Sequence, residues 1–163
     1  MKRLLLTLAM FLLSGLALAQ ERRGDDPVVS VRKGDPEMEA AIARARASLD
    51  EFLKIAAARP AGTEDFKLKV AIREGRHTEH FWVNPFRVSE PGFEGTLVNE
   101  PRLVRSLRRG QTIRFTREQI TDWGYRRDGR EVGSFTICVI LGRMPMQQAE
   151  ALRREHGFGC PGA

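Results

Sequence analysis

The sequence is poor in several residue types, and each shortage excludes a class of protein. Among 163 residues there are two cysteines, one tyrosine and two tryptophans, and aromatic residues make up 7% of the chain. Two cysteines exclude a small scaffold held together by several disulfides. Charged residues form 29% and hydrophobic residues 42% of the chain. This balance excludes both a polytopic membrane protein and a disordered chain, and the length suits one domain.

Long apolar runs are also scarce, and the one at the N-terminus indicates export. Met1-Lys2-Arg3 is followed by an apolar stretch from Leu4 to Leu13, and Ala17-Leu18-Ala19 precedes Gln20. A basic start, a short apolar stretch and small residues before the cut are the parts of a secretory signal peptide. A spanning helix needs about 20 apolar residues, and this stretch is shorter. We expect cleavage of residues 1–19 and a mature protein without a membrane span, in the periplasm or outside the cell.

A helical period follows a polar linker over residues 20–35. Between Pro36 and about Arg59, apolar residues recur at steps of three and four, which places them on one face of a helix. Asp35 can cap the start of this helix, and Arg59-Pro60 ends it. The apolar positions are Met38, Ile42, Ala45, Leu49, Phe52, Leu53 and Ala56. The pattern predicts one long amphipathic helix.

A period of two replaces the helical period after Gly62 and predicts strands. Apolar and polar residues alternate at 66–72, 78–83, 93–98 and 111–116. Residues 134–141 are apolar on both faces, which predicts a central strand of the sheet. A short helix is expected near the C-terminus, from Gln147 to His156. The expected fold is α+β, with the long helix packed on a meandering antiparallel sheet of about five strands. The main domain spans 36–142, and 143–163 form a C-terminal helix and tail.

The two cysteines, Cys138 and Cys160, can form one disulfide if the protein is exported. Such a bond would close a loop of about 22 residues and stabilise the fold by roughly 3 kcal/mol in the chain-entropy model. The alternative is a buried thiol at Cys138 and a free thiol in the tail. No C-x-x-C motif is present, so a redox role is not expected.

Polar and aromatic residues are densest in the segment His-Thr-Glu-His-Phe-Trp that begins at His77. On a strand, His77 and His80 point to opposite faces, so this spacing does not favour a metal site. His80 and Trp82 share a face, whereas Glu79 shares the face of Phe81. A carboxylate on a core-facing side needs an arginine or backbone amides as partners. Glu79 therefore belongs either to a functional site or to a structural hydrogen-bonded pair.

A second cluster places Asp122 beside two large aromatic residues, Trp123 and Tyr125. Such a carboxyl can act as an acid or base whose pKa is raised by burial, can anchor a ligand groove, or can cap a turn. The sequence leaves these three alternatives open.

A basic interval separates the two clusters. No acidic residue lies between Glu100 and Glu118, and six arginines do: Arg102, Arg105, Arg108, Arg109, Arg114 and Arg117. Guanidinium groups suit carboxylate and phosphate partners. Because an exported protein rarely meets nucleic acid, an anionic component of the cell envelope or another protein is the expected partner. The alternative is a solvated loop and strand face.

Short motifs in the middle of the chain resemble a known family. They are Glu79-His80-x-Trp82, Phe93-x-Gly95-x-Leu97-x-Asn99-x-Pro101, Gly110-x-x-Ile113, Ile120-x-Asp122-Trp123, and Gly129 with Gly133. Together they resemble the bacterial YegJ-like family, known as domain of unknown function 2314, over roughly residues 36–142. The resemblance implies a single domain and supports Glu79, His80, Asp122 and Trp123 as positions that matter. It implies no reaction, cofactor or ligand, because the family has none assigned.

Two functions fit these residues. The first is a non-catalytic binding or interaction module of the bacterial cell envelope, whose candidate binding residues are Glu79, His80, Trp82, Asp122, Trp123 and Tyr125. The second is a small hydrolase that uses Glu79 or Asp122 as a base, with His80 assisting. The sequence contains no G-x-S-x-G elbow and no P-loop, which favours the first function and a protein without a cofactor. Both functions require the segments around His80 and Asp122 to meet on one patch.

Overall fold

The computed structural model describes Arg32 and residues 34–160. The expected signal peptide and most of the expected linker therefore lie outside the described residues. In chain order the elements are α1 (Pro36–Ala47), α2 (Leu49–Ala58), β1 (Thr63–Glu74), β2 (His77–Ser89), β3 (Gly92–Leu97), β4 (Thr112–Phe115), a 3-10 helix (Arg117–Gln119), β5 (Ile120–Arg127), β6 (Arg130–Gly133), α3 (Phe135–Gly142) and α4 (Met146–His156). The fold is α+β, with six described strands rather than about five.

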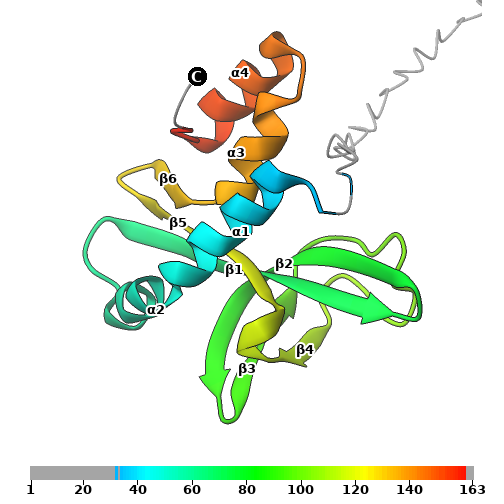
Figure 1. Cartoon of the computed structure of the whole chain (residues 1–163). Coiled ribbons are helices and arrows are strands. Elements are labelled where there is room, and N and C mark those ends of the chain that lie inside the picture. The colour runs from blue at the N-terminus through cyan, green and yellow to red at the C-terminus, as the bar shows by residue number, and fades with distance from the viewer. Residues whose placement is uncertain (1–31, 33, 161–163) are drawn as a thin grey trace, which may run out of the picture.

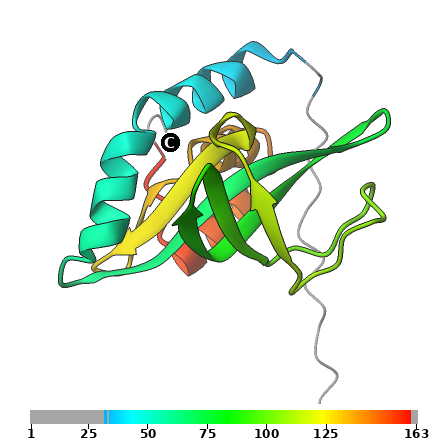
Figure 2. The ribbon, with the colours of Figure 1, turned by 90° about the horizontal axis from the view of Figure 1, so that it is seen from below.

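The strands form one antiparallel sheet in the order β4-β3-β2-β1-β5-β6. β1 and β2 make a long hairpin around Gly75, and β5 pairs with the other edge of β1. Only one strand therefore separates β2 from β5, although about 40 residues lie between their polar clusters in the sequence (Figure 1). Helices α1 and α2 run along one side of the sheet, as Figure 2 shows.

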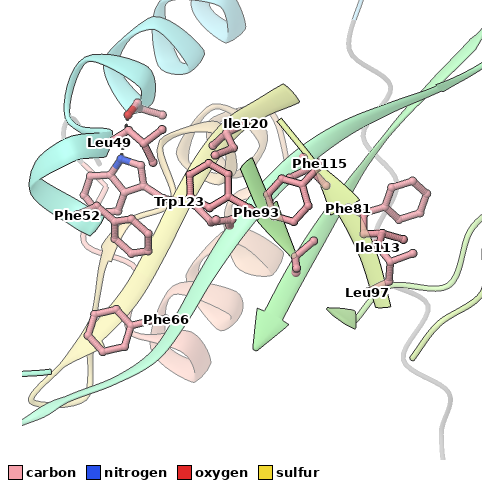
Figure 3. Close-up of a cluster of buried hydrophobic side chains, with 14 of the residues drawn as sticks. Leu49, Phe52, Phe66, Phe81, Phe93, Leu97, Ile113, Phe115, Ile120 and Trp123 are labelled. Atoms are coloured by element: carbon pink, nitrogen blue, oxygen red, sulfur yellow. Dashed lines mark hydrogen bonds between the residues drawn. The ribbon is translucent and has the colours of Figure 1, made fainter. Parts of the chain in front are cut away.

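The hydrophobic core lies between α1, α2 and the sheet face that they cover (Figure 3). The strands reach it with alternate residues, so that Leu68, Val70, Phe81 and Val83 have no exposed surface. Phe52 of α2 stacks on Trp123 of β5, with ring centroids 4.9 Å apart. Burying one such side chain contributes about 1.5–3 kcal/mol, so this face holds much of the folding energy.

The expected long helix is two helices, and Ser48 separates them. The Ser48 hydroxyl donates to the carbonyl of Arg44 at 2.8 Å, and the backbone there, with φ −104° and ψ 7°, leaves helical geometry. A serine that bonds back to the preceding turn bends a helix in this way. The predicted start is confirmed, because the Asp35 carboxylate accepts from the backbone N–H of Met38 at 3.1 Å.

The prediction of a central strand at residues 134–141 is wrong, because this apolar run forms helix α3. A short apolar run fits a buried strand and a buried helix equally well by periodicity. Two neighbouring features decide for the helix. Ser134 has a positive φ of 51°, which ends β6, and the Asp122 carboxylate accepts from the next two backbone N–H groups. A carboxylate at this place supplies the cap that a helix N-terminus needs.

β2 is longer than predicted, and two strands were not predicted. β2 continues past Pro85 to Ser89 because a register shift between Val83 and Phe86 accommodates the proline. β5 contains the Asp122 cluster, and the turn at Asp128-Gly129 leads back into β6. β5 does not alternate between apolar and polar residues, since six consecutive residues from Ile120 are buried.

Candidate functional site

The two clusters lie in one sheet and meet across β1. Glu79, His80 and Trp82 belong to β2, and Asp122, Trp123 and Tyr125 belong to β5. Contact between them is direct, because Nδ1 of His80 lies 3.0 Å from Oγ1 of Thr121. The sheet nevertheless divides the six candidate residues between its two faces.

Trp123 and Tyr125 belong to the hydrophobic core. Trp123 stacks on Phe52 with ring centroids 4.9 Å apart, and its Nε1 donates to the carbonyl of Ala45 at 2.9 Å (Figure 3). Tyr125 stacks on Phe66 at 5.1 Å and is 2% exposed. Their rings pack α1 and α2 onto the sheet. Both residues also line a hollow beside α2, together with Ser48 and Glu51.

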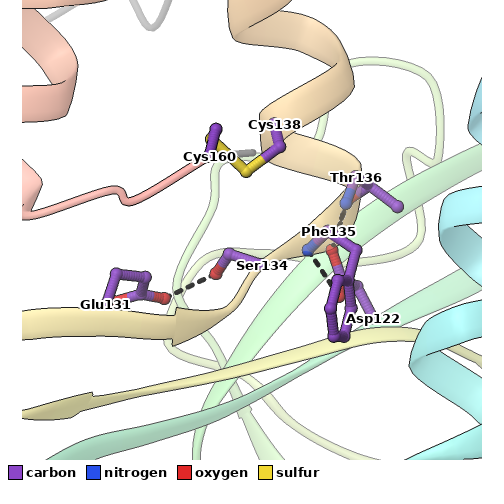
Figure 4. The surroundings of a disulfide bond; sticks show 7 residues. All are labelled: Asp122, Glu131, Ser134, Phe135, Thr136, Cys138 and Cys160. Carbon is purple, nitrogen blue, oxygen red and sulfur yellow. Dashed lines mark hydrogen bonds between the residues drawn. A yellow bond between two sulfur atoms is a disulfide. The ribbon is translucent and has the colours of Figure 1, made fainter. Parts of the chain in front are cut away.

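Asp122 caps helix α3 on the other face of the sheet. Its carboxylate accepts from the backbone N–H groups of Trp123, Phe135 and Thr136 at 2.9, 3.2 and 2.8 Å, and from the Thr136 hydroxyl at 2.6 Å (Figure 4). Burial raises the pKa of Asp122, while these hydrogen bonds and the charge of Lys69 oppose the rise. Of the three alternatives left open by the sequence, the geometry matches the capping residue.

A β-bulge explains why Asp122 faces away from the core. Asp122 lies opposite Lys69 and Ile120 lies opposite Val70, so β5 has one extra residue, Thr121, at this point. An extra residue lets two consecutive side chains point to the same face. Thr121 and Asp122 therefore both share the side of His80, which simple alternation would not predict.

Glu79 holds a loop through backbone amides. Its carboxylate accepts from the N–H groups of Arg102, Leu103 and Val104 at 2.8–3.1 Å. Neighbouring Glu74 accepts from the N–H groups of the next two residues along the loop, and these bonds together with the Ser106 hydroxyl hold the pKa of Glu74 below its usual value. Backbone amides are one of the two partners expected for a core-side carboxylate at Glu79.

His80 and Trp82 remain at the surface, on the face away from α1 and α2. The ring of Trp82 is half-buried, and the ammonium groups of Lys69 and Lys67 lie 5.4 and 5.7 Å from its centroid, within cation–π range. Lys69 also donates to the Thr136 hydroxyl at 3.0 Å. Sequence reasoning missed both lysines, although their alternation with Leu68 and Val70 was the available signal.

The charges on this face interact. Burial lowers the pKa of Lys69, and the nearby Asp122 carboxylate opposes that effect. Partial burial of the imidazole, followed in importance by the Lys69 charge, lowers the pKa of His80 to about 4. His80 is therefore neutral at physiological pH and can offer a ring nitrogen to a partner.

Cys138 of α3 and Cys160 form a disulfide (Figure 4). Their Cα atoms are 5.4 Å apart, and the bond ties the segment after α4 to α3. Of the two alternatives left open by the sequence, this geometry matches the disulfide.

Clusters of metal ligands and membrane-spanning helices were both sought in the described part of the chain. Residues 34–160 contain no group of three or more His, Cys, Asp or Glu side chains arranged to hold a metal ion. Among the described helices, none combines the length and the apolar character that crossing a bilayer requires.

Comparisons with known proteins agree with the residue pattern. A family described as an uncharacterized protein conserved in bacteria, domain of unknown function 2314, matches residues 35–159. The chain belongs to this family. It is 30% identical over 153 residues to the uncharacterized protein YegJ of Escherichia coli. The matched region covers 94% of this chain and 97% of that protein.

A second relative is matched over a smaller share of its own length. The chain is 28% identical over 153 residues to a putative ankyrin repeat protein of Neisseria meningitidis, covering 85% of this chain but 59% of that protein. No solved structure matches the chain. The match to domain of unknown function 2314 extends past Gly142 through α4, so the C-terminal helix belongs to the matched region.

Proposed function

We propose that this protein is an exported, non-catalytic binding module of the bacterial cell envelope, and that the sheet face bearing His80 and Trp82 contacts an anionic polymer such as an acidic glycan. One observation carries the proposal. Trp82 keeps exposed surface and two ammonium groups flank its ring. His80 is exposed beside it, and with Nδ1 directed at Thr121 its other ring nitrogen, Nε2, is left for a partner.

The chemistry of this face suits such a partner. An indole ring offers an apolar surface on which a sugar ring can stack, and neighbouring lysines attract carboxylate or phosphate groups. Lys67 is already paired with Glu131 at 2.9 Å, whereas the described ion pairs do not include Lys69. Lys69 therefore has no carboxylate within 4.0 Å among the described residues, and its ammonium lies between the Trp82 ring and the Thr136 hydroxyl.

The alternative function, a hydrolase that uses Glu79 or Asp122, has less support. Glu79 accepts hydrogen bonds from the 102–104 backbone on one side of the sheet, and Asp122 accepts from the start of α3 on the other. A general base needs a free lone pair within reach of the proton that it removes. Both carboxylates already hold several donors, and they do not share a site.

Export is part of the proposal, and the disulfide supports it. Disulfides persist in oxidising compartments and are rare in the cytosol. The apolar N-terminal stretch has the form of a signal peptide. If the chain is expressed with its own N-terminus in a bacterium, we expect the product in the periplasmic fraction to begin at Gln20. A full-length product confined to the cytoplasm would contradict export.

Trp82 can report binding directly. The Trp123→Phe variant keeps an aromatic ring in the core and leaves Trp82 as the one tryptophan. We expect its emission to shift when oligogalacturonate is added and to stay constant with a neutral maltooligosaccharide. Lys69→Gln should weaken the response about fivefold or more, because a close charge contact contributes about 1 kcal/mol or more.

The matched control is Lys54→Gln, since Lys54 is exposed on α2 at the other side of the sheet. It changes the net charge by the same amount and should leave the response unaltered. An unchanged emission spectrum of a folded Trp123→Phe variant at saturating oligogalacturonate would count against the acidic-glycan proposal.

A further inference from the structure

We infer that the loop between β3 and β4, residues 98–111, docks on a membrane surface that contains anionic phospholipid. We call this segment the arginine loop. It lies at the end of the molecule where β1 turns into β2, and both views of the ribbon show the two side by side (Figures 1 and 2). The start of the loop adjoins Trp82, because Asn99 Oδ1 accepts from the Trp82 N–H at 2.7 Å and the Val98 N–H donates to the Trp82 carbonyl at 3.0 Å. The arginines lie farther along the loop, from Arg102 to Arg109.

The arginine loop has a defined backbone although it lacks regular structure. Glu79 and Glu74 together accept from five consecutive backbone N–H groups, from Arg102 to Ser106. The side chain of Val104 is 1% exposed and belongs to the core. Charge-assisted hydrogen bonds of this kind are stronger than neutral ones. The loop is therefore held in one place before any partner binds.

The same arrangement leaves the arginine side chains facing water. Glu79 and Glu74 accept from the loop's backbone instead of pairing with its side chains. Glu100, at the start of the loop, is exposed and forms no ion pair with the arginines among the described residues. Arg102, Arg105, Arg108 and Arg109 are exposed, and none has a carboxylate within 4.0 Å among the described residues. The other two arginines of the acid-free interval differ, because Arg114 pairs with Glu94 and Arg117 with Asp50.

The hairpin tip adds to this charge. Arg73 donates from Nε to the carbonyl of Gly75, and Arg76 donates from Nε to His77. Neither bond involves a carboxylate. The Glu74 carboxylate accepts from the backbone N–H groups of Arg105 and Ser106, and so connects the hairpin to the loop. Arg73 and Arg76 therefore lie at the same end of the molecule as the arginine loop.

Exposed apolar side chains in the loop favour a lipid surface over a soluble polymer as the partner. Leu103 is 50% exposed between two of the arginines, and Val98 at the start of the loop is 39% exposed. A soluble acidic polymer would use the guanidinium groups but would leave Leu103 in water. A bilayer interface takes both, since phosphate groups pair with arginine and the acyl boundary accepts apolar side chains.

Vesicle sedimentation tests the inference. The chain beginning at Gln20 is used, because the apolar N-terminal stretch would itself bind lipid, and it keeps every residue of the described fold. We expect it to sediment with vesicles of phosphatidylcholine mixed with phosphatidylglycerol, but not with vesicles of phosphatidylcholine alone. The triple variant Arg105→Gln, Arg108→Gln, Arg109→Gln should bind about a hundredfold more weakly, since each basic residue near an anionic surface contributes about 1 kcal/mol.

The matched control removes three exposed arginines that have carboxylate partners: Arg114→Gln, Arg117→Gln, Arg154→Gln. Its net charge equals that of the loop variant, and its binding should stay within about threefold of the parent chain. Equal loss in both triple variants would overturn a specific surface. Leu103→Ser should weaken binding severalfold, with a loss that added salt does not abolish.

Two further arms separate this inference from the glycan proposal. Trp82→Ala should sediment with anionic vesicles as the parent does, whatever its response to oligogalacturonate. If soluble oligogalacturonate binds the arginine loop while anionic vesicles do not sediment the protein, the partner is an acidic polymer and the lipid inference is wrong. Circular dichroism confirms that each variant is folded.

Discussion

Two carboxylates, Asp122 and Glu79, do the same chemical work at two different places. Each accepts several backbone N–H groups from a segment distant in the sequence. Asp122 is fully buried and starts helix α3, whose other side packs on α1. Glu79 is only partly buried and holds the arginine loop, whose side chains stay in water. A carboxylate that accepts from backbone N–H groups can therefore stabilise the buried start of a helix in one region and hold an exposed, charged loop in another.

The largest expected effect is at Asp122. Asp122→Ala should lower the free energy of unfolding by about 3–5 kcal/mol, because it leaves buried N–H groups without an acceptor. Urea denaturation measures the loss. Asp50→Ala is the control, since Asp50 forms only an exposed pair with Arg117, and it should cost under about 1 kcal/mol. Similar losses of unfolding free energy for the two variants would contradict the role of Asp122 as a buried cap.

The disulfide is expected to come next. Cys138→Ser combined with Cys160→Ser should cost about 3 kcal/mol in the chain-entropy model, since the bond closes a loop with a sequence separation of 22. Urea denaturation without reductant measures this. Dithiothreitol should then lower the stability of the parent chain but not that of the variant. A parent chain insensitive to dithiothreitol would argue against the bond.

Glu79 should have a smaller and more local effect. Glu79→Gln should cost about 1–2 kcal/mol, because the amide keeps one oxygen as acceptor but loses the charge. Hydrogen exchange should accelerate at the amides of Arg102, Leu103 and Val104 while α3 stays protected. Glu90→Gln, an exposed control in the turn between β2 and β3, should change neither. Accelerated exchange throughout the protein would instead make Glu79 a core residue like Asp122.

The smallest effect concerns pH and His80. Its pKa in the folded state, about 4, lies below the ordinary value of 6.5, so the unfolded chain binds the proton more readily. The stability linked to His80 is complete above pH 6.5 and is lost as the pH falls towards 4. The residue keeps exposed surface, so the loss should be modest. In the His80→Gln variant, the midpoint of urea denaturation should change less with pH between 4 and 6.5 than in the parent chain. An NMR titration that gives the His80 ring a pKa near 6.5 would refute the lowered pKa.

Local patterns in the sequence predicted much of the fold. Alternation of apolar residues located β1, β3, β4 and the first half of β2, and Asp35 with Pro36 located the start of α1. These signals are local, because each depends on residues a few positions apart. The break at Ser48 escaped prediction, since the apolar face continues across it.

The candidate site was predicted less well than the fold. The sequence singles out Glu79, His80, Trp82 and Asp122 because polar and aromatic residues cluster around them, and in the structure Glu79 and Asp122 accept from backbone N–H groups. The packing of Trp123 and Tyr125 against the helices could not be predicted, because an aromatic residue has the same sequence signal in a groove and in a core. The bulge at Thr121 determines which side chains face the core, and no local pattern marks it.

The class of fold, the possibility of one disulfide and the acid-free interval follow from composition and short-range periodicity, so the sequence alone is enough to predict them. Tertiary structure alone decided that residues 134–141 are a helix and that the loop arginines lack carboxylate partners among the described residues. The physical reason is that a carboxylate can satisfy either a side chain or a backbone amide. Which one it meets depends on the segment that the sheet brings to it.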